Sequence, residues 1–502
     1  MVVRTYTVAF EGVEARTVEV QCALSSGLPA FSIVGLPDKA VSEAKERVRA
    51  ALIGLGLALP AKRITINLSP ADIPKEGSHF DLPIAFALLA ALGIVPPDVA
   101  ESTIALGELS LDGTLVPVSG ALPAALTASS TDRILLCPEA SGAEAAWVTE
   151  TQVIAARCLQ SVIRHFTGDA PIAPASPGDA STPNATRDFR DVKGQHRAKR
   201  ALEIAAAGRH HVLLVGPPGS GKSMLAARLP SILPPLTPAE ALDTSMIHSL
   251  AGTIEAGGLS RIAPFQEPHH TASVPAIVGG GRLAKPGQIS LAHNGVLFMD
   301  EFPEFPRALL ETLRQPIETG QVVIARANAH VRYPCRFMLI AAANPCRCGY
   351  LYDASQACGR APKCGDDYLG KISGPLLDRF DMRLEVPAVD LDALQDQADG
   401  ESSAEIAKRV AAARALQSER FASSEENTNA DMEGQVLELH AFPDADGCAL
   451  LKSAAEKIGL SARGYHRVLR VARTIADLDG SDTVARAHLA EALSYRLPAQ
   501  MT

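Results

Sequence analysis

Eight residues decide the fold of the central part of this chain: Gly216-Pro217-Pro218-Gly219-Ser220-Gly221-Lys222-Ser223. They match G-x-x-x-x-G-K-[ST], a loop whose backbone N–H groups and lysine hold nucleotide phosphates. An apolar run at 212–215 indicates a buried strand before the loop, and residues 224–229 indicate a helix after it. We expect Lys222 to reach the β- and γ-phosphates and the Ser223 hydroxyl to bind Mg²⁺. The alternative is a chance glycine-rich turn, and the flanking strand and helix argue against it.

The composition allows several cores and excludes some classes of protein. The 502 residues are 47% hydrophobic and 21% charged, which suggests about three domains. A formal net charge of −9 argues against a wholly basic nucleic-acid binder, but not against DNA in a local basic channel. No apolar run approaches the ~20 residues of a membrane span, and the N-terminus does not resemble a secretory signal. We therefore expect a cytoplasmic protein without a membrane partner.

Residues 1–167 show a mixed α/β pattern, in which strand-like runs alternate with helix-like ones at 38–53 and 80–92. Within this region, 68–81 (LSPADIPKEGSHFD) resembles the active-site stretch of Lon-type proteases, and 107–120 resembles the segment that delivers the Lon catalytic lysine. Lon enzymes hydrolyse with a Ser–Lys dyad.

The positions that match the dyad carry His79 and Leu122, while Ser78 stands one position early. The resemblance therefore implies a Lon-protease-like domain that has lost its chemistry. A protease with Ser78 as its nucleophile is the alternative. Residues 168–188, rich in Pro, Ala, Ser, Thr and Asp, are typical of a flexible linker.

Further motifs follow the phosphate loop at plausible intervals. The apolar run 296–299 ends in Asp300 and Glu301, about eighty residues after the loop. This is the Walker B pattern, in which Asp300 holds the Mg²⁺ shell and Glu301 activates water as general base. Asn344 ends a second apolar run and resembles sensor 1, which orients the water; the alternative is a turn asparagine.

Residues 372–381 (ISGPLLDRFD) resemble the segment that presents the arginine finger in the magnesium-chelatase and MCM branch of AAA+ proteins. The resemblance implies that Arg379 acts in the nucleotide site of the next subunit of a ring, most often of six. The alternative is a surface ion pair. Residues 191–195 resemble the AAA+ segment that wraps the adenine.

Two insertions mark the same branch. Residues 279–293 resemble the helix-2 insert, and 322–332 resemble the pre-sensor-1 hairpin. Because such loops face the ring pore in motor relatives, three basic residues are candidate DNA phosphate contacts: Lys285, Arg326 and Arg332. Ordinary solvated side chains are the alternative. For the adjacent histidines 269 and 270 we expect packing or hydrogen bonding, because neighbouring side chains point different ways.

Four of the nine cysteines lie close together between Asn344 and the finger segment: Cys346, Cys348, Cys358 and Cys364. Four thiolates at this spacing can bind a structural Zn²⁺ tetrahedrally. Free thiols in a surface loop are the alternative. Residues 396–502 indicate a helical lid, in which 461–473 resembles a sensor 2 helix. Arg463 is the first candidate for the sensing arginine and Arg467 the second; a basic helix face is the alternative.

The whole order of motifs resembles the YifB/ComM family of magnesium-chelatase-like AAA+ ATPases. The resemblance implies an α/β protein with a Lon-protease-like domain (1–167), a linker (168–188), an AAA+ P-loop NTPase core (189–395) and a helical lid (396–502). It also implies ATP and Mg²⁺ as cofactors, and a hexameric motor that drives DNA branch migration in natural transformation. Gln288 and the pair Gln266-Glu267 depart from the family's usual residues, which bears on substrate contacts.

Two other functions fit the same motifs. One is a chelatase-like or protein-remodelling ATPase that docks a protein partner through the N-terminal domain. The other is an adaptor in which nucleotide is a structural switch, against which the intact Asp300-Glu301 pair argues.

Overall fold

Long runs of β-branched and alternating residues at the N-terminus form two antiparallel strands, β1 (Val2–Glu11) and β2 (Glu14–Ser25). The computed structural model describes residues 2–179, 187–254, 257–281, 284–325, 330–351, 356–389, 400–424 and 426–496. The first sheet has the order β3-β4-β2-β1-β5-β8-β9. Its other strands are β3 (Ala30–Val34), β4 (Arg63–Ser69), β5 (Thr103–Ala105), β8 (Ile134–Pro138) and β9 (Val153–Ala156).

Helix α2 (Asp81–Ala91) is apolar on all sides, and ten of its eleven residues are buried against this sheet. The remaining elements of the N-terminal body are α1 (Lys39–Gly54), α3 (Pro97–Glu101), α4 (Ala121–Ser130), α5 (Glu139–Ala145), α6 (Leu159–Phe166), β6 (Glu108–Leu109) and β7 (Leu115–Val116). The predicted mixed α/β character of residues 1–167 is confirmed.

A second, five-stranded sheet forms the centre of the second body (residues 187–496), in the order β11-β14-β17-β10-β18. These strands, all parallel to their neighbours, are β10 (Val212–Val215), β11 (Phe265–Gln266), β14 (Val296–Met299), β17 (Met338–Ala343) and β18 (Met382–Glu385). Every residue of β10, β14 and β17 is buried, as in a parallel sheet covered on both faces. The carboxyl ends of these three strands therefore meet at one edge.

The helices of this body cover the sheet and carry its insertions: α7 (His196–Gly208), α8 (Lys222–Ala226), α9 (Pro238–Ala251), α10 (Val274–Val278), α11 (Gln288–Leu291), α12 (Arg307–Thr312), α13 (Arg314–Thr319), α14 (Lys363–Leu369) and α15 (Gly374–Leu377). Two antiparallel hairpins project toward the N-terminal body: β12 (Gly279–Gly280) with β13 (Lys285–Pro286), and β15 (Gln321–Ala325) with β16 (His330–Pro334). The predicted hairpin over 322–332 is confirmed in its described strands.

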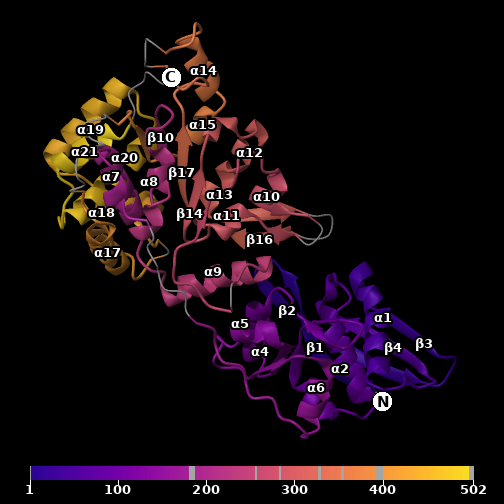
Figure 1. Cartoon of the computed structure of the whole chain (residues 1–502). Coiled ribbons are helices and arrows are strands. Elements are labelled where there is room, and N and C mark those ends of the chain that lie inside the picture. The colour runs from indigo at the N-terminus through magenta and orange to yellow at the C-terminus, as the bar shows by residue number, and fades with distance from the viewer. Residues whose placement is uncertain are drawn as a thin grey trace.

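The C-terminal helices pack against α7 on one side of the sheet (Figure 1). They are α17 (Ser403–Arg420), α18 (Gly434–Ala441), α19 (Ala445–Ile458), α20 (Ala462–Leu478) and α21 (Arg486–Ser494). None of the helices within the described ranges is long and apolar enough to cross a bilayer.

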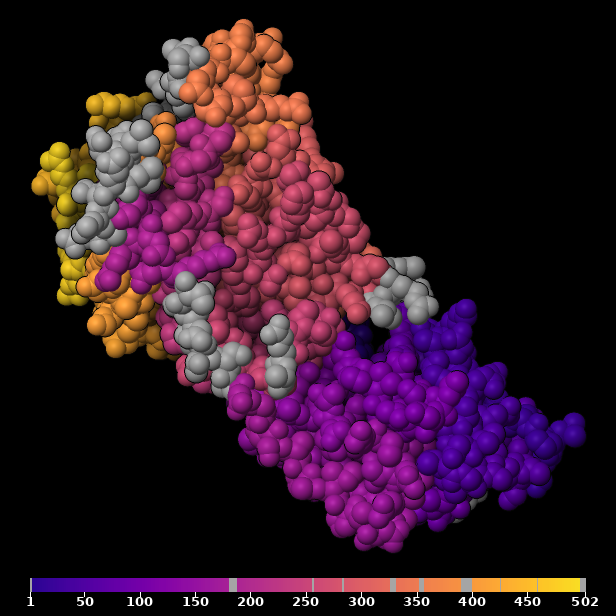
Figure 2. Space-filling model, viewed as in Figure 1, coloured from indigo at the N-terminus to yellow at the C-terminus, as the bar shows by residue number. Residues whose placement is uncertain are grey.

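The N-terminal body lies against α9 and the two hairpins (Figures 1 and 2). Leu242 and Met246 of α9 pack against its core, and the Gly120 N–H donates to the Ser249 carbonyl over 3.1 Å. A Cβ at Gly12 would lie 2.4 Å from the Arg332 carbonyl oxygen of β16, so the two backbones approach closely there. The two bodies are thus joined through the inserted elements.

The predicted linker 168–188 differs from a free spacer over its first half. The Ala175 N–H donates to the Val153 carbonyl over 2.9 Å, and the Gly178 N–H to the Ala143 carbonyl over 3.2 Å. Backbone groups in this stretch find partners on β9 and α5, which composition alone does not reveal. Residues 180–186 lie outside the described part of the chain.

Candidate nucleotide site

Lys222 lies at the start of α8 and folds back over the phosphate loop. Its Nζ donates to the carbonyl oxygens of Gly216 (2.7 Å) and Pro217 (2.8 Å), and it lies 3.3 Å from Asn344 Oδ1. Burial lowers the pKa of Lys222, and the nearby Asp300 charge opposes that shift. Among the described residues no carboxylate forms an ion pair with Lys222. An oxyanion of a bound phosphate would supply that partner.

Asp300 joins the phosphate loop to the end of β14. The Ser223 hydroxyl donates to Asp300 Oδ2 over 2.5 Å, and Asp300 Oδ1 accepts the Glu301 N–H over 2.8 Å. A hydroxyl and a carboxylate are the hard oxygen ligands that Mg²⁺ takes beside nucleotide phosphates. The residues present therefore fit a magnesium ion.

Glu301 has a left-handed backbone conformation, with φ at +50°, so the extended course of β14 does not continue through it. Its side chain is 51% exposed, and its Oε2 lies 3.2 Å from His270 Nδ1. His270 follows β11, which pairs with β14, so neighbouring strands bring the two side chains to the same edge. Sequence reasoning expected hydrogen bonding from the histidine pair but missed this partner, because only the strand order places it there.

The rings of His269 and His270 lie side by side, although neighbouring side chains were expected to point in different directions. Their ring centroids are 4.2 Å apart, and His269 Nδ1 lies 2.8 Å from Thr271 Oγ1. Only His270 of the two contacts Glu301 within the described residues. The expected hydrogen-bonding role therefore belongs to both rings, with different partners.

Asn344 follows β17, the strand between β10 and β14. Three sequence motifs thus converge at one sheet edge: the phosphate loop, the Asp300-Glu301 pair and Asn344. Gln195, from the segment expected to wrap the adenine, donates to the Ser220 carbonyl over 3.1 Å and to the Pro387 carbonyl over 2.7 Å. The geometry offers a site for a nucleotide, a hard cation and a water beside a carboxylate.

Arg379 and Arg463 lie apart from this edge. Neither makes a hydrogen bond or ion pair with residues 216–223 in the described part of the chain. Both approach the same carboxylate, Glu318, and Arg379 is only 5% exposed. The second candidate for the sensing arginine, Arg467, pairs with buried Asp381 over 2.5 Å.

Three of the four clustered cysteines have their sulfur atoms within 4.8 Å of one another: Cys346, Cys348 and Cys364. The Cys346 and Cys348 sulfurs are 3.0 Å apart, and this hydrogen bond is the main cause that lowers the pKa of Cys348 to about 6. Cys358 lies outside that tight group, but its side chain hydrogen-bonds both Cys348 and Cys364. The set of soft donors fits a zinc ion.

The cysteine loop packs onto the phosphate loop. A Cβ at Gly349 would lie 2.5 Å from Pro218 Cδ, so this glycine allows a close approach. The spacing of cysteines in the sequence did not reveal this contact. Order in the cysteine loop can therefore support the shape of the phosphate loop.

Two of the three predicted DNA contacts lie on the hairpins. Lys285 is exposed on β13 and Arg332 is exposed on β16. Arg326 lies outside the described residues. Lys285 also lines the cavity between the two bodies, whose lining includes carboxylates of the N-terminal body.

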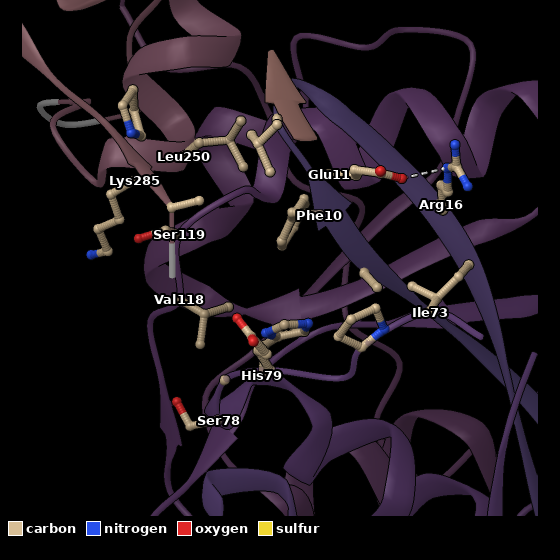
Figure 3. Close-up of a pocket in the computed structure, with 18 of the residues that line it drawn as sticks. Phe10, Glu11, Arg16, Ile73, Ser78, His79, Val118, Ser119, Leu250 and Lys285 are labelled. Atoms are coloured by element: carbon tan, nitrogen blue, oxygen red, sulfur yellow. Dashed lines mark ion pairs between the residues drawn. The ribbon is translucent and has the colours of Figure 1, made fainter. Parts of the chain in front are cut away.

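That cavity, of about 670 Å³, lies where residues 72–79 meet the hairpins (Figure 3). Ser78 donates a hydrogen bond to Glu108, and His79 Nε2 lies 2.9 Å from the Val8 carbonyl. Burial lowers the pKa of His79 to about 4, so the ring is neutral at pH 7. Leu122 is fully buried in α4. Among the described residues that line the cavity, the only lysine, Lys285, comes from the second body.

The parallel sheet, with the phosphate loop and Asp300-Glu301 at one edge, defines a P-loop NTPase. Three family models match the chain: "Magnesium chelatase, subunit ChlI" at residues 188–394, "Subunit ChlI of Mg-chelatase" at 18–141, and "Magnesium chelatase, subunit ChlI C-terminal" at 400–496. The chain belongs to the YifB/ComM family of magnesium-chelatase-like proteins.

Similarity to individual proteins covers nearly all of the chain. It is 44% identical to YifB of Salmonella typhimurium over 494 residues, which span 98% of this chain and 96% of YifB. It is 43% identical to the competence protein ComM of Haemophilus influenzae over 498 residues, again 98% and 96%. The magnesium-chelatase 38 kDa subunit of Rhodobacter capsulatus is 26% identical over 358 residues, 66% of this chain and 93% of that subunit.

Proposed function

We propose that this protein is an ATP-hydrolysing ring motor that acts on DNA, a hexameric helicase that drives branch migration when single-stranded DNA is integrated during transformation. The observation that carries the ATPase part is the convergence of Lys222, Asp300-Glu301 and Asn344 at one sheet edge. The DNA part is supported by the 43% identity to a competence protein over nearly the full length of both chains.

The residues of the edge have distinct proposed roles. Residues 216–223 hold the triphosphate, with Lys222 on the β- and γ-phosphates. Ser223 and Asp300 hold Mg²⁺, which neutralises charge on the phosphate oxygens when bound. Glu301 accepts a proton from the attacking water, which Asn344 orients.

Two arginines complete the site from outside the phosphate loop. Arg379 stabilises charge on the γ-phosphate held by the neighbouring subunit, and Arg463 senses the same phosphate. Among the described residues, both arginines contact Glu318 and neither contacts residues 216–223 of its own chain, which suits a role in a partner site of a ring.

The other parts of the chain have supporting roles in this proposal. Residues 1–167 are a Lon-protease-like domain without its dyad, 189–395 the AAA+ core and 396–502 the lid. A structural zinc bound by Cys346, Cys348, Cys358 and Cys364 orders the loop that packs on the phosphate loop. Lys285, Arg326 and Arg332 contact DNA phosphates.

A protein-remodelling ATPase is the second candidate, and the cavity between the bodies favours it. The residues that line this cavity include four carboxylates, Glu11, Asp72, Glu76 and Glu108, and two cations, Arg16 and Lys285, of which Arg16 pairs with Glu11. The excess of carboxylates suits a partner segment with basic side chains.

Strand exchange on a labelled forked or four-way DNA junction tests the proposal. The wild-type protein with ATP and Mg²⁺ is compared with the Lys222→Ala variant. Processing by the wild type but not the variant is expected. Robust hydrolysis and ring assembly without any processing would contradict the DNA part and favour protein remodelling.

A further inference from the structure

Helix α13 (Arg314–Thr319) is held at both of its ends by one side chain, that of Arg379. The Arg379 Nε donates to the Arg314 carbonyl over 3.1 Å at the start of the helix. One turn later, its Nη2 forms an ion pair with the Glu318 carboxylate. The remaining terminal nitrogen, Nη1, donates to the Pro375 carbonyl over 2.6 Å, within the segment that carries Arg379 itself. The guanidinium thus joins α13 to α15.

A second arginine approaches the same carboxylate oxygen. Nη1 of Arg463, at the start of lid helix α20, lies 3.9 Å from Glu318 Oε1, which also accepts from Arg379. Glu318 is 44% exposed and Arg463 64% exposed, so this group borders solvent. The two arginines proposed to act on the neighbour's nucleotide are therefore both engaged by one anion of their own chain.

The guanidinium N–H groups that bind Glu318 are the groups that would bind a phosphate. A guanidinium has five N–H groups in a fixed fork and cannot give the same ones to two anions in different places. Arg379 is 95% buried in its present contacts, since only 5% of its surface is exposed. Its three contacts use three of its five N–H groups, including those nearest Glu318, and the buried group has to move out of these contacts to meet a phosphate on another subunit.

Helix α13 continues directly into the hairpin. Gly320 ends the helix in a left-handed conformation, with φ at +63°, and β15 begins at the next residue. Gln321 pairs with Pro334 at the base of the hairpin, and the Cys335 N–H donates to the Gly320 carbonyl over 2.8 Å. Movement of α13 is therefore transmitted to the base of β15 and β16.

We propose that Glu318 is a positioning residue that holds Arg379 and Arg463 until the γ-phosphate on a neighbouring subunit replaces its carboxylate. A triphosphate with its greater charge competes for the guanidinium groups, and their departure frees both ends of α13. The hairpin attached to α13 then moves. This coupling rests on the proposed ring ATPase and adds the residue that links its nucleotide to the β15–β16 hairpin.

Hydrogen exchange of the hairpin tests this coupling on the full-length, assembled protein. Amides of residues 321–325 and 331–333 are followed without nucleotide, with ADP and with a non-hydrolysable ATP analogue, in the wild type and in Glu318→Gln. Steady-state hydrolysis is measured in parallel. Glu456→Gln is the matched control, because Glu456 is exposed on α19, far along the chain from α13.

In the wild type we expect the ATP analogue, but not ADP, to raise exchange in the hairpin. In Glu318→Gln, hairpin exchange should be about tenfold higher than in the wild type even without nucleotide, and the analogue should change it little. The loss of a hydrogen bond between charged groups shifts a local opening equilibrium by about that factor. The control should behave as the wild type.

The following results distinguish a failure of this inference from a failure of the proposed function. Wild-type exchange that ignores the analogue, or a Glu318→Gln variant that matches the wild type, overturns the inference. A wild type that hydrolyses no ATP overturns the proposed function instead. If Glu318→Gln does not fold, Glu318→Asp replaces it, because aspartate keeps the charge but is shorter by one methylene. Hairpin exchange in Glu318→Asp should then be higher than in the wild type. Exchange equal to that of the wild type would overturn the inference.

Discussion

The Ser223 hydroxyl donates a 2.5 Å hydrogen bond to Asp300 Oδ2, across 77 residues of sequence. The two groups predicted to hold Mg²⁺ thus lie in direct contact. Their contact joins the first turn of α8 to the end of β14, so the fold itself places the two ligands together. Such preorganisation lowers the free-energy cost of ordering the site when a ligand binds.

Replacing Glu301 by Gln should leave ATP binding intact and lower turnover by about 10²–10⁴-fold, because the amide cannot accept a proton from water. Phosphate release and fluorescent-nucleotide binding measure the two effects separately. Glu304→Gln is the local control, since Glu304 pairs with Lys371 and has no proposed role in the reaction. Normal turnover in Glu301→Gln would remove Glu301 from its role.

Replacing Arg379 by Ala should lower hydrolysis by about 10³–10⁵-fold in the assembled ring, the range known for arginine fingers. If the arginine acts in a neighbouring site, a mixture of Arg379→Ala and Lys222→Ala subunits should hydrolyse more ATP than either variant alone. Mixed rings contain sites with an intact phosphate loop on one subunit and an intact arginine on the next. A mixture no more active than its components would place Arg379 outside the partner site.

Native mass spectrometry should find about one zinc ion per chain in folded protein. Replacing Cys346 or Cys364 by Ser should abolish binding, and chelation should raise hydrogen exchange in the described residues around the cluster, because a closed site orders its loop. Cys448→Ser, which changes a half-buried cysteine outside the cluster, is the control. Well-folded protein without zinc would contradict the assignment.

Asp381 is buried and pairs with Arg467 of α20. Burial alone would raise the pKa of Asp381, but the Arg467 charge and neighbouring histidines hold it well below its ordinary value. The ionised carboxylate therefore stabilises the folded state above about pH 4, the pKa of an unfolded aspartate, and this contribution declines as the pH falls toward the folded pKa.

Replacing Asp381 by Asn should destabilise the ATPase body by about 3–5 kcal/mol at pH 7, because the Arg467 charge loses its partner inside the protein. Thermal unfolding between pH 3 and pH 7 measures the effect, and the variant should lose less stability on acidification than the wild type. The double variant with Arg467→Met should recover part of the loss. Equal acid sensitivity of wild type and Asp381→Asn would show that this pair does not control the response.

Local sequence predicted the elements of the site well. The phosphate loop lies between β10 and α8, Asp300 follows β14 and Asn344 follows β17, as expected from apolar runs and glycine chemistry. These features depend on neighbouring residues, so they can be recognised in a single chain. The family, too, followed from the order of such local motifs.

Other features depended on contacts between distant segments. The sequence by itself determined which strands, loop and helices this protein makes, since periodicity and backbone preferences act over a few residues. Only the tertiary structure decided that His270 approaches Glu301, that Gly349 packs on Pro218, and that Glu318 engages both Arg379 and Arg463. Strand order and helix packing set these contacts, because they juxtapose side chains whose separation in the sequence carries no periodic signal.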